Sequence, residues 1–261
     1  MKQKSQSCVM SEKWHAWAIL GLLLTIFVPK IALAQTPEEI LDSMDRQMTF
    51  DSRHVIARME IYKGTAEPDV KRLEMWSKEW DSTFSVFLSP ERDKGVRYLK
   101  LGDQLYMASA AGDVVQISGH MLRNGLMDSD FSYEDMMEAR AMKADYNVTL
   151  IGDEPLEGKS CWILELNEKK PGQTYSKRKV WIEKETYLPR KTELYAKGGD
   201  VLKILTQLGT ATYGDRKYPE KIIMRDLSKK DSRTEIHFEK ADFGKQLPEN
   251  IFSRRNLRKS G

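Results

Sequence analysis

The chain has 261 residues, of which 40% are hydrophobic and 31% charged, so it can build a core and is not disordered throughout. A mean hydropathy of -0.56 argues against a protein with several membrane spans. The first 34 residues carry the formal charge of +3, because removing them from the 42 basic and 39 acidic side chains leaves 38 of each. A remainder without net charge argues against a nucleic-acid binder, which neutralises phosphates with basic side chains.

The N-terminal segment has the pattern of a secretory signal peptide. Lysines precede an apolar run over residues 16–28, which has the length of a signal-peptide core and is short for a membrane span. Ala32 and Ala34 then form a small-residue cleavage site. We therefore expect residues 1–34 to be removed, so that Gln35 begins a mature protein in the periplasm of a Gram-negative cell. The alternative is an uncleaved membrane anchor.

The mature chain is predicted to open with a helix. Thr36 suits the N-cap, Pro37 suits the first helical position, and Glu39 completes a capping box. Apolar residues follow at helical spacing: Ile40, Leu41, Met44 and Met48. The pattern therefore predicts an amphipathic helix with one buried face.

Beyond residue 50 the apolar period falls to two, which indicates β-strands. Alternation begins around Val55 and returns at intervals of roughly ten residues as far as Phe238. Gly102 and Asp103 separate two of these runs as a hairpin turn does, and residues 229–231 separate another pair. These short strands predict an antiparallel sheet, a sandwich or a barrel.

A second helix is predicted in the middle of the chain, after a loop over residues 118–131. Ser132 and Asp135 have the spacing of a capping pair. An apolar stripe continues from them: Tyr133, Met136, Met137 and Met142. The fold class is therefore mainly β with some α (α+β), and no linker or break in composition divides residues 35–261, so we expect one domain.

The sequence carries no recognisable catalytic constellation. It lacks a nucleophile elbow, a P-loop and a dinucleotide-binding glycine motif. His54, His120 and His237 have no second ligand at the usual zinc spacing, and Cys161 stands in an apolar run typical of a buried thiol. We therefore expect no enzyme, no cofactor and no metal site, and a hydrolase is the least favoured hypothesis.

Soft apolar residues are abundant instead, including 13 methionines. Flexible methionines are over-used on surfaces that accept variable apolar ligands. A curved sheet closed by helices can leave a hollow for an acyl chain, and each buried methylene contributes about 0.8 kcal/mol. Alternation on the strands and the stripe on the second helix give the predicted ligand-binding residues: Met59, Ile61, Met75, Phe84, Val86, Met136 and Met137.

Four short segments occur in a characteristic order along the chain: 128–135 (DSDFSYED), 178–183 (RKVWIE), 188–191 (LPRK) and 247–250 (LPEN). Together with the helix and hairpins around them, they resemble the outer-membrane lipoprotein-sorting (LolA-like) family of periplasmic proteins. The resemblance covers residues 35–257. It implies an unclosed antiparallel β-barrel, that is, a strongly curved sheet capped by helices.

The same resemblance implies a carrier that shields the acyl chains of lipoproteins or lipids on their way to the outer membrane. An inner-membrane transporter is an implied partner. In the family an arginine on an early strand holds the lid, and Arg58, Arg72 and Arg97 are the candidates here. The alternative is a periplasmic interaction or sensor module that docks on a membrane protein or a lipid-export permease.

Overall fold

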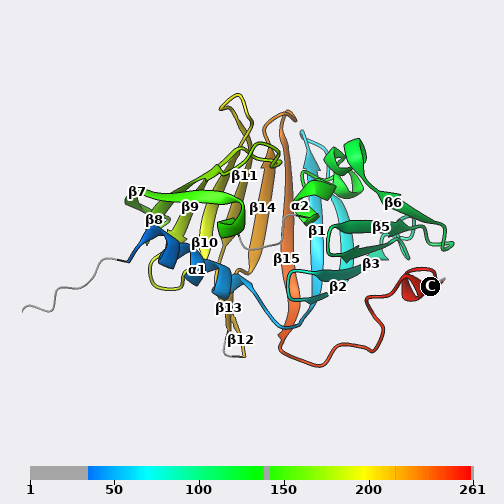
Figure 1. The fold of residues 1–261 in the computed structure, drawn as a ribbon. Coiled ribbons are helices and arrows are strands. Elements are labelled where there is room, and N and C mark those ends of the chain that lie inside the picture. The colour runs from blue at the N-terminus through cyan, green and yellow to red at the C-terminus, as the bar shows by residue number, and fades with distance from the viewer. Residues whose placement is uncertain (1–34, 138–141, 215, 260–261) are drawn as a thin grey trace, which may run out of the picture. The chain divides into compact units, whose positions relative to one another are not determined.

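The computed structural model describes residues 35–137, 142–214 and 216–259, and the predicted signal peptide lies outside this part. In the described part, no helix is both long and apolar enough to cross a membrane. One antiparallel sheet of 13 strands forms most of it, with the order β6-β5-β4-β3-β2-β1-β15-β14-β11-β10-β9-β8-β7. The predicted unclosed, curved antiparallel sheet is therefore confirmed (Figure 1).

The strands of this sheet follow the predicted hairpins closely. They are β1 (Arg53–Lys63), β2 (Asp69–Lys78), β3 (Ser82–Ser89), β4 (Arg97–Leu101), β5 (Gln104–Ala108), β6 (Val114–Ile117), β7 (Tyr146–Leu156), β8 (Lys159–Glu168), β9 (Lys177–Glu183), β10 (Pro189–Tyr195), β11 (Val201–Leu208), β14 (Lys221–Asp226) and β15 (Ser232–Phe243). A separate hairpin, β12 (Ala211–Tyr213) with β13 (Arg216–Tyr218), was not expected from the sequence.

The strand order explains why a long segment must cross the sheet. β1 pairs with β15 at the centre, whereas β6 and β7 lie at the two edges although they are consecutive in the chain. The connection between them therefore has to pass from one edge to the other, and residues 118–137 and 142–145 of it are described. Figure 1 shows its helix α2 (Tyr133–Met137) in front of the central strands.

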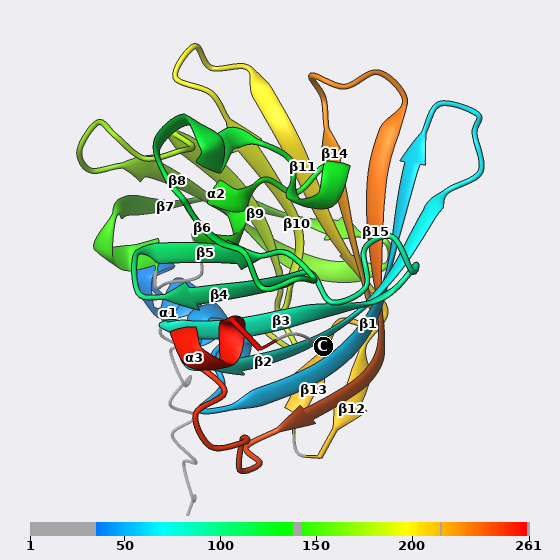
Figure 2. The ribbon, with the colours of Figure 1, turned by 90° about the vertical axis from the view of Figure 1, so that its right-hand side faces the viewer.

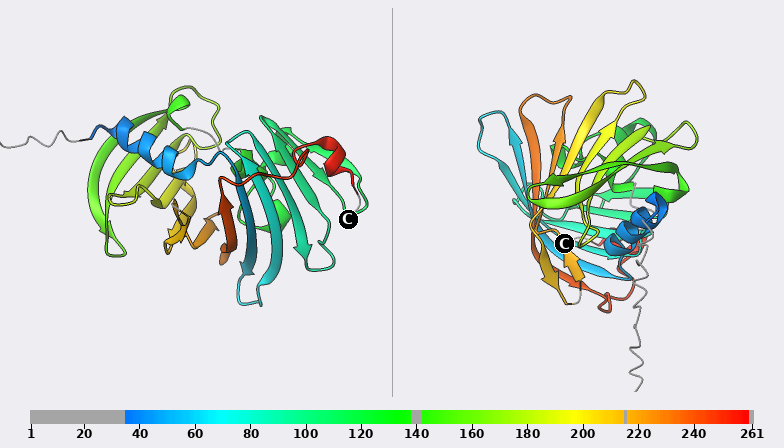
Figure 3. Two further views of the ribbon diagram at one scale, coloured as in Figure 1. Left: turned by 90° about the horizontal axis from the view of Figure 1, so that it is seen from below. Right: turned by 90° about the vertical axis from the view of Figure 1, so that its left-hand side faces the viewer.

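Helix α1 (Pro37–Met48) forms as predicted. The Thr36 side chain accepts from the Glu39 backbone N–H, and the Glu39 side chain accepts from the Thr36 backbone N–H. Ile40, Leu41 and Met44 are buried against strands β7–β9, on the inner face of the sheet. Figure 3 shows α1 running along this half of the sheet. The helix therefore forms one wall of the interior.

The inner face of β1 carries alternate side chains into the core. Val55, Ala57, Met59 and Ile61 are all buried there, and their cluster includes Leu73 of β2. Residues directly opposite in an antiparallel pair share a face, so the register of β1 with β2 and β15 fixes which neighbours join them.

The outer face of strands β3–β5 is covered as well. The C-terminal helix α3 (Arg254–Leu257) packs there, and its Leu257 is fully buried against Phe84, Leu99 and Tyr106 (Figure 2). In the β2–β3 register, Phe84 is paired with Trp76 and lies on this outer face. The sequence-based placement of Phe84 and Val86 on the inner face was wrong, because the covering helix makes the outer face apolar too.

Two of the sequence motifs meet in a buried ion pair at the turn between β9 and β10. Arg190 donates to Glu183 through Nε at 2.8 Å and through a second guanidinium nitrogen. Burial alone would raise the pKa of Glu183, but the hydrogen bonds from Arg190 and Thr186 hold it below its usual value. These motif residues fix the β9–β10 hairpin.

Candidate functional site

The segment that crosses the inner face is tightly folded. It contains two 3-10 turns, Gly119–Arg123 and Leu126–Asp128, where the sequence predicted a loop. Gly125 approaches Ser132 as an isolated β-bridge, and a Cβ at Gly125 would lie 2.7 Å from the Ser129 carbonyl oxygen. Only glycine fits such a close approach, so this residue lets the segment fold back on itself.

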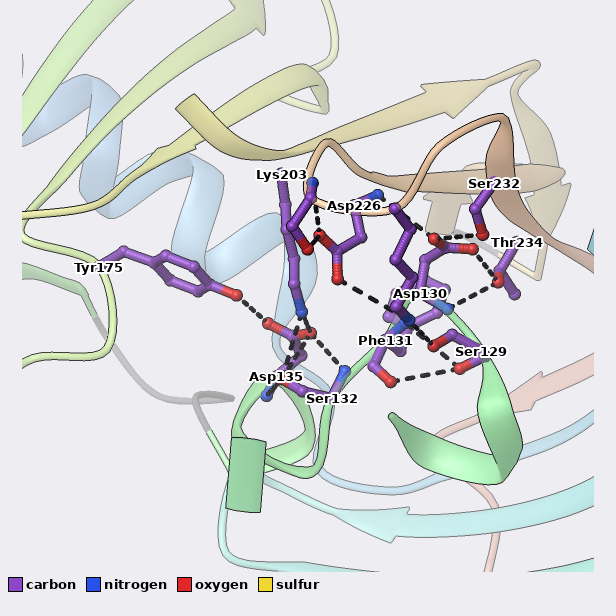
Figure 4. Close-up of polar contacts among 12 residues, drawn as sticks. Ser129, Asp130, Phe131, Ser132, Asp135, Tyr175, Lys203, Asp226, Ser232 and Thr234 are labelled. Carbon is purple, nitrogen blue, oxygen red and sulfur yellow. Dashed lines mark hydrogen bonds and ion pairs between the residues drawn. The ribbon is translucent and has the colours of Figure 1, made fainter. Parts of the chain in front are cut away.

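Asp130 anchors the crossing segment to the β14–β15 hairpin (Figure 4). Its Oδ2 accepts a hydrogen bond from Thr234 Oγ1 at 2.7 Å, and its Oδ1 accepts from Ser232 Oγ at 2.8 Å. The Asp130 backbone N–H donates to Thr234 Oγ1 at 2.9 Å. Asp130 and Thr234 are both buried, so these hydrogen bonds replace those that the carboxylate would otherwise make with water.

Asp135 fixes helix α2 to the other half of the sheet. Its Oδ2 lies 2.7 Å from Lys203 Nζ on β11 and accepts from the Ser132 backbone N–H at 2.7 Å. Its Oδ1 accepts from Tyr175 Oη at 2.6 Å (Figure 4). Because the Asp135 N–H also donates to Ser132 Oγ, the predicted capping pair is confirmed. Asp135, Ser132, Tyr175 and Lys203 are called the α2 latch below.

A largely apolar cavity of about 340 Å³ lies between α2 and the central strands. Its walls include Ala57 and Met59 of β1, Met75 of β2 and Met136 of α2. A second cavity of about 280 Å³ lies towards α1, with Met44, Leu205 and Met224 in its lining. Three residues occur in the lining of both cavities: Arg53, Phe131 and Asp135. The crossing segment therefore separates two adjoining hollows.

A more polar hollow of about 570 Å³ lies between the crossing segment and Lys203 of β11. Lys203 and Lys229 line it together with Asp130 and Asp226. Lys229 donates to the Ser129 carbonyl oxygen at 2.7 Å and lies 3.8 Å from Asp226. Lys203 and Lys229 are thus both paired with carboxylates, Lys203 with Asp135 and Lys229 with Asp226.

The structure separates the residues predicted to bind ligand. Met59, Met75 and Met136 line the larger apolar cavity, and Ile61 is buried in the same core cluster. Met137 instead lines a separate hollow of about 220 Å³ beside Tyr146. Phe84 and Val86 lie in the cluster under α3 and line neither apolar cavity.

The three arginines proposed to hold a lid bind elsewhere. Arg58 pairs with Glu60, Arg72 pairs with Glu239 at 2.8 Å, and Arg97 donates to the Ser109 carbonyl oxygen. The cation that joins α2 to the sheet is Lys203. In the sequence its only signal is a lysine among apolar residues of a strand, on the same face as Leu205, which lines the smaller cavity.

The one group of possible metal ligands found among the described residues consists of Glu60, Glu235 and His237, on the outer face of β1 and β15. Glu235 already pairs with Arg233 at 2.8 Å and Lys221 at 3.1 Å. Burial lowers the pKa of His237, and nearby cations lower it further. These positive charges would compete with a metal ion, so this cluster is an ion-pair network.

Burial also shifts the pKa values of two further groups, the half-buried Asp45 and the buried Cys161. Burial raises the pKa of Asp45 from 3.8 to about 6, and the neighbouring Asp42 adds to the shift. Asp45 lines the smaller apolar cavity. Burial also raises the pKa of the Cys161 thiol, which is fully buried as expected, and this disfavours the reactive thiolate.

Comparisons with known proteins agree with this geometry. A family model described as "Uncharacterized protein" matches residues 79–259. The fold is similar to a DUF1329 family protein from Desulfovibrio piger, with a TM-score of 0.78, 23% identity, and coverage of 86% of this chain and 100% of that one. No curated protein matches the sequence.

Two further crystal structures share the fold. One is a putative outer membrane lipoprotein-sorting protein domain from Vibrio parahaemolyticus, with a TM-score of 0.73, 23% identity, and coverage of 86% of this chain and 98% of that one. The other is a LolA superfamily protein from Nitrosomonas europaea, with a TM-score of 0.71, 21% identity, and coverage of 85% and 100%. At these identities the similarity establishes the fold.

Proposed function

Since the chain belongs to the family matched over residues 79–259 and has the fold of LolA-like lipoprotein-sorting proteins, we propose that it is a periplasmic carrier of acyl chains. The cargo is the acyl part of lipoproteins or lipids, carried towards the outer membrane without chemical change. Residues 1–34 serve as the signal peptide, and an inner-membrane transporter supplies the cargo.

The pair of adjoining apolar cavities carries this proposal. A protein interior is normally packed to the density of an organic crystal, so hollows of about 340 and 280 Å³ side by side are a feature to be explained. An acyl chain fills them with about 0.8 kcal/mol of favourable transfer free energy for each buried methylene. Methionines in the lining adapt to chains of different length.

Helix α2 serves as the lid in this proposal. It covers the larger cavity with Met136 and is joined to the opposite half of the sheet through Asp135 and Lys203. Entry of a long chain requires this connection to open, and the buried ion pair restores a single closed position afterwards. Lys203 thus takes the part that the family resemblance gave to an arginine.

The rival hypothesis, an interaction or sensor module, predicts a filled interior and a binding surface outside it. The two cavities favour the carrier. We therefore put forward one function for the protein.

The experiment measures uptake of a fluorescent acyl probe from micelles by protein purified after expression of the full chain. Ala57→Phe places a ring in the larger cavity, because Ala57 is buried on the inner face and lines that cavity. We expect uptake to fall by about tenfold or more, since the ring occupies space that the chain needs. The matched control is Ile56→Phe, at the neighbouring position on the outer face.

Uptake that is absent from the wild-type protein, or equal in the two variants, would overturn the proposal. Mass spectrometry of lipids that co-purify with the wild-type protein gives a second measurement that needs no variant, and we expect acyl lipids in stoichiometric amount. The intact mass of the same preparation tests cleavage after Ala34.

A further inference from the structure

Arg53 is a charged residue in an otherwise apolar row. It begins β1, and the residues that follow it on the inner face are Val55, Ala57, Met59 and Ile61, all buried. The Arg53 guanidinium lines both apolar cavities, at the place where they adjoin. A cation exposed to an apolar cavity is costly unless it gains a partner, so its position calls for an explanation.

The neighbours of Arg53 do not neutralise it. It donates to Tyr218 Oη at 2.8 Å and weakly to Ser77 Oγ at 3.3 Å, and both acceptors are neutral. Among the described residues, no carboxylate lies within ion-pair distance of it. Asp135 shares the lining of both cavities, but its charge is compensated by Lys203 at 2.7 Å. An anion could therefore bind at Arg53 without displacing an existing partner.

The other charged side chains around the cavities are of both signs, because Asp45 also lines the smaller cavity. Lys100 lines the larger cavity and Arg178 the smaller one. Lys100 donates to the Trp80 carbonyl oxygen, and Arg178 lies over the rings of Tyr146 and Tyr175. Arg53, whose two side-chain acceptors are neutral, is therefore the cation that favours a negatively charged group on the ligand.

We propose that Arg53 is the binding site for the anionic head group of a single-chain or two-chain amphiphile whose hydrocarbon fills the adjoining cavities. The inference rests on the proposed function and adds to it the chemical class of the cargo: a carboxylate or phosphate head with an acyl tail. A guanidinium can donate two parallel hydrogen bonds to either head group.

The experiment compares three single-chain probes of equal length on the protein purified after expression of the full chain: a fluorescent fatty acid, its methyl ester, and an alkyl phosphate as competitor. We expect the acid to bind about tenfold more tightly than the ester, as a charge-assisted hydrogen bond allows. Arg53→Gln is expected to abolish this preference while leaving ester affinity within about twofold. Arg53→Lys is expected to retain part of it.

The matched control is Arg58→Gln, five residues further along β1 and on the outer face, which should keep the wild-type preference. Equal binding of acid and ester to the wild type would overturn the inference, as would an unchanged preference in Arg53→Gln. If that variant fails to fold, the ratio of acid to ester affinity in the wild type and in Arg53→Lys still tests the inference. Failure of every probe to bind the wild type would instead contradict the proposed function itself.

Discussion

At Asp135 one carboxylate accepts hydrogen bonds from Lys203, Tyr175 and the Ser132 backbone, and the ion pair is almost completely buried. Removing one partner of such a pair leaves the other charge unpaired in the interior. We expect Asp135→Asn to lower the free energy of unfolding by about 3–5 kcal/mol, measured by urea denaturation.

The control for this change is Asp128→Asn, because Asp128 is exposed and belongs to the same crossing segment. Its backbone φ is 62°, a conformation that asparagine tolerates well. The double variant Asp135→Asn with Lys203→Met should recover part of the loss, since no charge is then left alone. Equal stability of Asp135→Asn and Asp128→Asn would contradict the role of the α2 latch.

Asp45 gives the protein a distinct pH dependence. Its pKa is raised to about 6 in the folded state, first by burial and then by Asp42, so the folded protein binds the proton more tightly than the unfolded chain does. The contribution of this group to stability is therefore lost as the pH rises from about 4 to about 6. Asp45→Asn should match the wild type below pH 4 and exceed its stability above pH 6.

The measurement is urea denaturation of both proteins at several pH values between about 3 and about 8, with Asp51→Asn as the control at an exposed site. Only the difference between variant and wild type isolates this carboxyl from the others. Curves for Asp45→Asn and the wild type that run parallel across this range would show that Asp45 titrates normally.

At the scale of elements, the C-terminal helix α3 acts as a strap on the outer face of the sheet. Leu257 is fully buried there against Phe84 and Leu99. Leu257→Ala should lower the free energy of unfolding by about 2–5 kcal/mol, as for other buried leucines, while affinity for the acyl probe stays unchanged. Urea denaturation and probe titration check the two parts.

The control for the strap is Arg255→Ala, which changes an exposed residue of the same helix. A stability loss in Leu257→Ala no larger than in this control would mean that α3 is not held by its leucine. A large loss of probe affinity in Leu257→Ala would mean that packing on the outer face of the sheet alters the shape of the cavities on its inner face.

Helix α3 also shows why the helices and strands could be predicted from the sequence while the inward face of β3 could not. Helix α1 and the hairpins were predictable, because caps, turns and apolar period are local signals. On β3, however, the apolar residues Phe84 and Val86 face outward, while Thr83 and Ser85 line the larger cavity. Alternation assigns side chains to two faces of a strand but does not show which face points to the interior. Helix α3, over 150 residues further along the chain, covers the outer face of β3, so Phe84 and Val86 of this strand face outward.

At the scale of the whole described molecule, the pairing of β1 with β15 decides where the ligand site lies. It places β6 and β7 at the two ends of the sheet, so the segment that contains residues 118–137 crosses the inner face between them. The crossing segment is anchored at Asp130 and Asp135 and leaves a hollow on each side. The cavities are thus a consequence of topology and of the two anchoring carboxylates.

The sequence by itself determined the leader pattern, the strand-rich fold class, the two capped helices and the motifs of the family, because each depends on residues close together in the chain. Only the tertiary structure decided that Lys203 meets Asp135, that Arg53 stands unneutralised between two cavities, and that Phe84 lies outside them. The physical reason is that a charge or an apolar side chain acquires its role from partners that strand pairing brings near, and pairing over such distances leaves no local signal in the sequence.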